Sequence, residues 1–197
     1  MTYIDQIKKI ISKNNGIVLT SDLAKKQIPR TYLSVLQKNQ TIERHSRGVY
    51  IAKNVLEDEM FCLQIRNKRA IFSHETALFI HDLTDKIPYS YTVTVPSGYN
   101  ASSLKQSGHK VFFVKFDLYQ LGATETNSPH NNSIRVFNVE RTICDILRSR
   151  NRIDIQIIND AIKRYVKGKY FNINQLFNYA SKFKIQNLVR QHVEFFL

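Results

Sequence analysis

Residues 20–51 read TSDLAKKQIPRTYLSVLQKNQTIERHSRGVYI. A short helical pattern comes first, followed by a turn at Ile28-Pro29, a second helical pattern, and two β-prone runs at Thr41–Arg44 and Val49–Ile51. Pro29 suits the first turn of a helix because its missing N–H is no loss there. Gly48 suits a tight hairpin turn because glycine adopts a positive φ without steric cost. The order helix, turn, helix, hairpin predicts a winged helix-turn-helix.

The second helical pattern carries side chains of the types that read DNA. Tyr32, Leu33 and Leu36 share its inner side, which leaves the polar residues on the outer arc. Arg pairs with guanine edges, Gln with adenine, and Ser or Thr with bases or phosphates. The hairpin adds two arginines that can contact the phosphate backbone or enter the minor groove. The DNA-binding residues we expect are Arg30, Thr31, Ser34, Gln37, Lys38, Arg44 and Arg47. A small helical domain with an ordinary hairpin is the alternative interpretation.

Positive charge is concentrated in the same part of the chain. The 197 residues include 29 Lys and Arg against 16 Asp and Glu, a net charge of +13. Residues 1–55 hold 10 basic and 3 acidic side chains, net +7, whereas residues 56–197 hold 19 and 13, net +6. This distribution is expected if the first quarter of the chain contacts a polyanion such as double-stranded DNA. A basic face that only keeps the protein soluble is the competing explanation.

The sequence gives no sign of a membrane or secretory protein. No apolar run approaches the ~20 residues that cross a bilayer, and the N-terminus alternates apolar and charged residues instead of forming the continuous apolar block of a secretory signal. We therefore expect a cytoplasmic protein without membrane contact. Cys62 and Cys144 lie far apart within apolar helical patterns, which predicts buried free thiols and not a disulfide or a metal pair.

The pattern changes after Lys53-Asn54, so we place a domain boundary there, with a winged helix-turn-helix over 1–55 and a larger domain over 56–197. Strand patterns and helical patterns mix in the larger domain, and its last part is helical throughout, which predicts an α+β domain ending in several helices. The expected strands are Ala70–Phe72, Tyr89–Val95, Lys110–Phe116 and Ser133–Asn138, with helices over Leu56–Asn67, Ser73–Leu83 and four segments after Val139, and a mobile polar loop over Thr124–Asn132.

Catalytic and cofactor-binding constellations are missing from the sequence. A nucleotidyltransferase needs a Gly-Ser turn followed by paired aspartates, but Ser97-Gly98 leads into YNASSL. There is no GxxxxGK motif to hold phosphates, and no His and Cys cluster with metal-ligand spacing. We therefore predict no enzyme activity, no cofactor and no metal.

Two polar groups have structural interpretations. Ser73 is expected to cap the helix that follows, with His74 in the same cap and His81 in a packing or surface position, in preference to a nucleophile and base pair. Arg141 and Asp145 are spaced i, i+4, which predicts an ion pair that anchors their helix against the strands.

The chain also resembles a known family at three places. These are the Arg-Gly-Val-Tyr end of the hairpin (Arg47 to Tyr50), the Ser-His-Glu-Thr-Ala-Leu helix start (Ser73 to Leu78) and Glu-Arg-Thr-Ile-Cys-Asp (Glu140 to Asp145). From Ile4 to about Val166 the chain is similar to the AbiEi-type antitoxins of bacterial abortive-infection systems, which defend against phage.

The resemblance implies a repressor with a second task. The winged helix would bind inverted repeats in the promoter of its own operon, with self-association on the DNA. The second domain would counter a cognate nucleotidyltransferase toxin without forming a stable complex, the arrangement called type IV.

A second basic concentration is a candidate surface for that task or for nucleic acid. Residues 148–169 hold seven basic and two acidic side chains. The candidate residues are Arg148, Arg150, Arg152, Lys163, Arg164 and Lys167. A solvated helix face is the alternative for this run of charge.

Two further functions remain open from the sequence. The first is a conventional winged-helix regulator whose second domain senses a small molecule. The other is an enzyme with a DNA-targeting module, which the missing catalytic residues disfavour. A nucleotidyltransferase reading frame directly downstream would favour the antitoxin, whereas a metabolic operon would favour the sensor.

Overall fold

The computed structural model describes residues 2–169 and 171–196, and the fold is mixed α+β as the sequence predicts. Within these residues the chain forms eleven α-helices and two β-sheets. It divides into two compact units. The first unit comprises the residues up to Leu63 together with Asn127–Ser133, and the second comprises Gln64–Thr126 and the residues from Ile134 onward. None of the helices in the described part is both long and apolar enough to span a bilayer.

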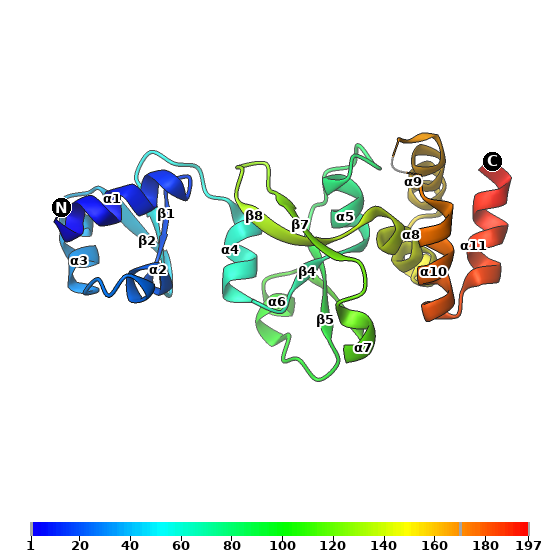
Figure 1. Cartoon of the computed structure of the whole chain (residues 1–197), viewed down its shortest axis with the longest axis horizontal. Helices are drawn as coiled ribbons and strands as arrows, with labels where there is room; N and C mark the ends of the chain where they lie inside the picture. The colour runs from blue at the N-terminus through cyan, green and yellow to red at the C-terminus, as the bar shows by residue number, and fades with distance from the viewer. Residues whose placement is uncertain (1, 170, 197) are drawn as a thin grey trace. The chain divides into compact units, whose positions relative to one another are not determined.

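Three helices and a three-stranded antiparallel sheet make up most of the first unit (Figure 1). The helices are α1 (Tyr3–Lys13), α2 (Thr20–Lys25) and α3 (Thr31–Lys38), and the strands β1 (Ile17–Leu19), β2 (Ile42–Ser46) and β3 (Val49–Ala52) lie in the order β1-β3-β2. Helix α1 ends where Asn15 and Gly16 adopt positive φ, as expected for a C-terminal cap. Helix α4 (Glu59–Arg66) follows the sheet, and the division between the units falls within it.

Apolar residues at helical spacing form the core of the first unit. Leu33 and Leu36 are each only 2% exposed, and Tyr32 packs against the same cluster, which confirms the predicted inner side of α3. The buried members of the cluster are Ile7, Ile10, Val18, Leu23, Ile28, Leu33, Leu36 and Ile42. Because the core uses the inner faces of all three helices, the outer face of α3 is left to solvent.

A five-stranded sheet in the order β6-β5-β4-β8-β7 is the centre of the second unit. Its strands are β4 (Ile71–Phe72), β5 (Thr92–Pro96), β6 (Lys110–Val114), β7 (Ala123–Asn127) and β8 (Ser133–Phe137). β4 runs antiparallel to β5 and parallel to β8, and β5 runs parallel to β6. The sheet is therefore mixed.

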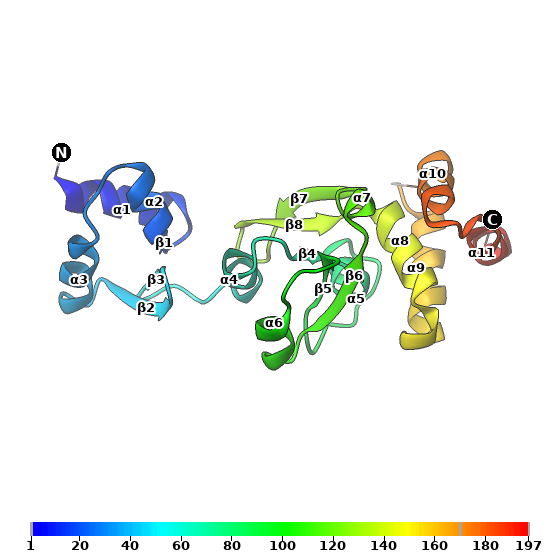
Figure 2. The ribbon, with the colours of Figure 1, turned by 90° about the horizontal axis from the view of Figure 1, so that it is seen from below.

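Helices follow the last strand and group together, as Figure 2 shows. They are α8 (Val139–Arg148), α9 (Ile155–Lys167), α10 (Ile173–Phe183) and α11 (Gln186–Val193); α5 (His74–Ile80), α6 (Ser102–Gln106) and α7 (Phe116–Tyr119) lie between strands. Helix α8 contacts α5, α9, α10 and α11, so that every residue from Glu140 to Leu147 is buried. A polar side chain on α8 must therefore find a partner inside the protein.

Several expected elements differ in extent or type. The predicted strand Tyr89–Val95 begins only at Thr92, and the helix expected from Leu56 begins at Glu59. The polar loop expected over Thr124–Asn132 is wrong in its first part, because Ala123–Asn127 forms the edge strand β7. Two short helices, α6 and α7, were not predicted.

Residues 127–133 contribute to the first unit although they are distant in sequence. Asp58 is 1% exposed; its carboxylate accepts hydrogen bonds from Ser128 Oγ and, at 2.8 Å, from Asn132 Nδ2. Asn15 Nδ2 donates to the Asn131 carbonyl at 2.8 Å. These bonds hold the segment in place, which corrects the expectation of a mobile loop.

Candidate nucleic-acid interface

Helix α3 presents a polar surface to solvent. Arg30 occupies its N-cap position and Thr31 its first turn. Of the five residues predicted on the outer arc, Arg30, Thr31, Ser34 and Lys38 are exposed and Gln37 is partly buried. Thr31, Ser34 and Lys38 are spaced i, i+3, i+7, which puts them on one side of the helix. The structure thus brings together the residues that were singled out on this helix.

The β2–β3 hairpin follows α3 and adds two arginines. Arg44 lies opposite Tyr50 in the register, and Arg47 occupies the turn with Gly48, whose φ is +80° as the sequence predicts. Both arginines are exposed. The register shifts between Arg44 and Ser46, so His45 occupies an irregularity of the β-bulge type.

The cations of this surface have no intramolecular counter-charge among the described residues. None of the side chains of Arg30, Lys38, Arg44 and Arg47 takes part in an ion pair or a side-chain hydrogen bond there. Unneutralised exposed cations create a positive potential that attracts polyanions. The surface therefore has the donors and the charge that a nucleic acid requires.

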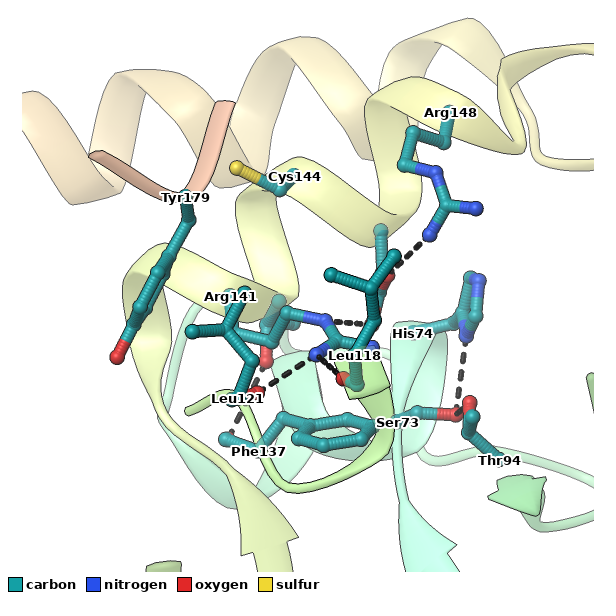
Figure 3. A network of polar contacts seen from close by, with 12 residues as sticks. Ser73, His74, Thr94, Leu118, Leu121, Phe137, Arg141, Cys144, Arg148 and Tyr179 are labelled. Atoms are coloured by element: carbon teal, nitrogen blue, oxygen red, sulfur yellow. Dashed lines mark hydrogen bonds and ion pairs between the residues drawn. The ribbon is translucent and has the colours of Figure 1, made fainter. Parts of the chain in front are cut away.

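A buried polar network occupies the second unit (Figure 3). Arg141 is 0% exposed, and its Nε donates to Asp145 Oδ2 at 2.9 Å, which confirms the predicted i, i+4 pair. Its NH1 donates to the carbonyls of Leu118 and Leu121 at 2.9 and 2.6 Å. The guanidinium lies 4.0 Å from the centroid of the Phe137 ring. Arg141 thereby joins α8 to the α7–β7 connection and the sheet.

His74 belongs to the same region but not in the predicted role. Ser73 is the N-cap residue of α5, as predicted, but its side chain makes no cap hydrogen bond. Its hydroxyl lies 3.0 Å from His74 Nδ1 and accepts from Thr94 Oγ1 at 2.8 Å. His74 Nε2 lies 3.1 Å from Ser149 Oγ, and the ring stacks on Phe112 with centroids 3.7 Å apart. Burial lowers the pKa of the imidazole from 6.5 to about 4, against the opposing effect of the Asp145 carboxylate. His74 is therefore a neutral buried connector between β5, α5 and the end of α8.

The second basic concentration is partly neutralised. Arg148 pairs with Asp145 at 3.2 Å and lies over the Phe183 ring, and both terminal nitrogens of Arg164 bond to the carboxylate of Asp85. Lys163, Arg164 and Lys167 share one cavity of about 780 Å³. Its other lining residues are His81, Asp82, Leu83, Asp160, Gly168 and Lys169. Three of the six candidate residues therefore meet, whereas Arg148, Arg150 and Arg152 do not line this cavity.

One group of side chains in the first unit was missed by the sequence reasoning. The group consists of His45 in β2, Glu57 just before α4 and Cys62 in α4, whose ligand-type atoms all lie within 4.8 Å of one another. The three residues come from two separate segments, so no local spacing motif could reveal them. Both cysteines are buried and neither forms a disulfide among the described residues.

Comparisons with known proteins bear on the fold. No family model and no curated protein match the chain. A crystal structure of the RV2827C protein from Mycobacterium tuberculosis is similar, with a TM-score of 0.62 over 98% of this chain and 77% of that one, at 10% sequence identity. At that identity the likeness concerns the fold alone.

Proposed function

We propose that the first unit is a winged helix-turn-helix that binds double-stranded DNA. Helix α2, the turn at Ile28-Pro29 and α3 form the helix-turn-helix, and the β2–β3 hairpin forms the wing. The single observation that carries this proposal is the outer face of α3 with the adjoining hairpin, where four cations have no intramolecular counter-charge among the described residues. In this arrangement Ser34 and Gln37 read base edges, while Arg44 and Arg47 hold the phosphate backbone.

Binding to the DNA directly upstream of the gene tests the proposal. Affinity should fall steeply with salt, because each neutralised phosphate contributes a slope of about −0.9 in log K against log salt concentration. Arg47→Ala should weaken binding to all sequences alike and reduce the magnitude of that slope by about 1. Gln37→Ala should instead change which sequence is preferred, by roughly 1–3 kcal/mol at one position.

Arg69→Ala is the matched control, since Arg69 is an exposed arginine of the second unit that lies outside both candidate nucleic-acid surfaces. It should leave affinity and salt slope unchanged. Binding by the full chain that is insensitive to salt, or equally weakened by Arg47→Ala and Arg69→Ala, would contradict the assignment of this surface.

We further propose that the whole chain is an antitoxin that represses its own operon through inverted repeats and counters a nucleotidyltransferase toxin. The support is the resemblance to AbiEi-type antitoxins, together with the exposed cations around α9. Two of the three resembling motifs, at Ser73–Leu78 and Glu140–Asp145, contribute to the buried network of Figure 3. Those motifs therefore account for the architecture of the second unit and leave its exposed surface to act on the toxin or on the toxin's target.

Co-expression with a nucleotidyltransferase encoded next to the gene tests this second proposal. Growth should be restored by the full chain and also by the Arg47→Ala variant, because counteraction is assigned to the second unit. No stable complex should form when the two purified proteins are mixed.

One observation favours the alternative of a regulator that senses a small molecule. The cavity beside α9 has about 780 Å³ and both basic and acidic groups on its wall, within the range of small-molecule sites. A metabolic operon beside the gene, and a metabolite that changes operator affinity, would favour this alternative over the antitoxin.

A further inference from the structure

Three side chains that commonly bind transition metals converge in the first unit. They are the imidazole of His45, the carboxylate of Glu57 and the thiol of Cys62, and their ligand atoms all lie within 4.8 Å of one another. His45 and Glu57 are already in contact, with Nε2 and Oε1 2.9 Å apart. One nitrogen, one oxygen and one sulfur thus face a common point.

The backbone of the hairpin sets the position of His45. The register of β2 against β3 shifts between Arg44 and Ser46, and an extra residue of this kind turns its side chain away from the regular alternation of the strand. His45 is that residue, and its ring meets Glu57 although twelve positions separate them. The bulge therefore gives the imidazole a direction that regular pairing would not.

The other two ligands stand on a segment with fixed geometry. Asp58 follows Glu57, is 1% exposed, and accepts from the backbone N–H of Phe61 at 3.0 Å as well as from Ser128 and Asn132. Cys62 is 0% exposed, and its N–H donates to the Asp58 carbonyl at 2.9 Å. A ligand set held by such neighbours needs little ordering when it binds an ion.

We propose that His45, Glu57 and Cys62 form a binding site for a divalent transition-metal ion of the zinc class. Zn²⁺ accepts imidazole nitrogen, thiolate sulfur and carboxylate oxygen in one tetrahedral shell, and the thiolate disfavours Mg²⁺ and Ca²⁺. Three protein ligands leave the fourth position for water. Binding converts the Cys62 thiol to a thiolate and releases its proton to solvent.

A bound ion would crosslink the β2–β3 hairpin to α4 and the residues just before it. His45 lies between Arg44 and Arg47 in sequence, so an ion at this point fixes strand β2, which carries Arg44 and leads directly into the turn that carries Arg47. This inference requires neither DNA nor a toxin, and its failure would leave the proposed function untouched.

Titration of the full chain with Zn²⁺ against a chromophoric chelator tests the site. We expect one ion per chain, and Co²⁺ in its place should give the near-ultraviolet thiolate-to-metal absorption band. Cys62→Ser should abolish that band and weaken Zn²⁺ binding by at least about tenfold. His45→Gln should weaken binding while keeping the band, because the thiolate is still present.

Cys144→Ser is the matched control, since Cys144 is also a buried thiol outside any disulfide but lies in the second unit. It should bind one ion and show the band as the unaltered chain does. Circular dichroism identifies a variant that fails to fold, and Zn²⁺ should raise the melting temperature of the unaltered chain but not of Cys62→Ser. A folded unaltered chain that binds no Zn²⁺, or a band that survives in Cys62→Ser, would overturn the proposal; His45 and Glu57 would then be a simple ion pair.

Discussion

The buried charge of Arg141 is stabilised by the groups that surround its guanidinium. Its guanidinium has a carboxylate, two backbone carbonyls and two aromatic rings as partners, those of Phe137 and Phe183. Burial lowers the pKa of Arg141, and Asp145 opposes that shift. Removing the guanidinium would leave the Asp145 carboxylate, 2% exposed, with Arg148 as its ion-pair partner.

Arg141→Met should therefore lower the free energy of unfolding by roughly 3–5 kcal/mol, the range for breaking a buried ion pair. Chemical denaturation at pH 7 measures it. Arg190→Met is the control, because Arg190 and Glu194 form a pair with the same i, i+4 spacing whose side chains are 62% and 64% exposed. Its effect should stay below about 1 kcal/mol. Equal effects of the two substitutions would contradict a special role for the buried pair.

His74 predicts a dependence of stability on pH. Its folded pKa of about 4 lies below the unfolded value near 6.5, so the unfolded chain binds the proton first as the pH falls. Stability should therefore decrease between pH 6.5 and pH 4, by roughly 3 kcal/mol from this residue. His81, whose pKa burial also lowers, adds in the same direction.

The unfolding free energy of His74→Asn should depend less on pH than that of the unaltered chain. Asparagine suits the positive φ of 49° at this position. His130→Gln, at an exposed position, should keep the full dependence. A His74→Asn variant with an unchanged slope from pH 7 to pH 5 would show that other groups cause it.

Single residues were predictable from the sequence where the signal is local. The i, i+4 spacing of Arg141 and Asp145 predicts their pair, and it is present. Ser73 occupies the predicted N-cap position, but its side chain makes no cap hydrogen bond, because its hydroxyl contacts His74 and accepts from Thr94, 21 positions away. The convergence of His45 with Glu57 and Cys62 depends on tertiary structure in the same way, and so was not foreseen.

At the scale of elements, close packing of the α7–β7 connection against α8 depends on Gly122. A Cβ at this position would lie 2.6 Å from Arg141 Cβ and 2.9 Å from Asn138 Oδ1, and φ is +74°. Gly108 has a similar φ of +79°, but no atom within 4 Å of an added Cβ. An alanine at Gly108 would therefore meet only the free-energy cost of the positive φ, whereas an alanine at Gly122 would meet that cost and steric crowding as well.

Gly108→Ala should lower the free energy of unfolding by about 1–2 kcal/mol, the cost of a left-handed conformation for a residue with a Cβ. Gly122→Ala should lower it further, because the helix or the connection must also move. Denaturation of both variants under one condition measures the difference. Equal losses in the free energy of unfolding would mean that the α7–β7 connection accommodates the added Cβ at no further cost.

Strong, periodic elements were predictable, and weak ones were not. The four helices expected after Val139 and the strand β6 follow clear apolar patterns and are present in the structure. The edge strand β7 has the sequence ATETN, and its mostly exposed side chains provide no apolar alternation to reveal it. Helices α6 and α7 span five and four residues, too short for a helical period to be recognised.

At the scale of the whole molecule, the proposed tasks are assigned to different units and should be separable. The variant Lys163→Glu, Arg164→Glu, Lys167→Glu should lose antitoxicity in co-expression while keeping operator affinity. Lys68→Glu, Arg69→Glu, Lys115→Glu makes the same change in net charge at other exposed positions of the second unit, and should keep both activities. Unchanged neutralisation by the first variant would remove the surface beside α9 from consideration.

The segment Asn127–Ser133 has a consequence for the order in which the protein is made. Asp58 is translated early, but its partners Ser128 and Asn132 follow roughly 70 residues later, after strands β4–β7. At about 5–20 residues per second, a ribosome needs roughly 4–14 s to reach them. The first unit therefore cannot complete its native contacts when residues up to Leu63 have left the ribosome. Its folding is complete only after Asn127–Ser133, which follow a long stretch of the second unit in sequence, have been synthesised.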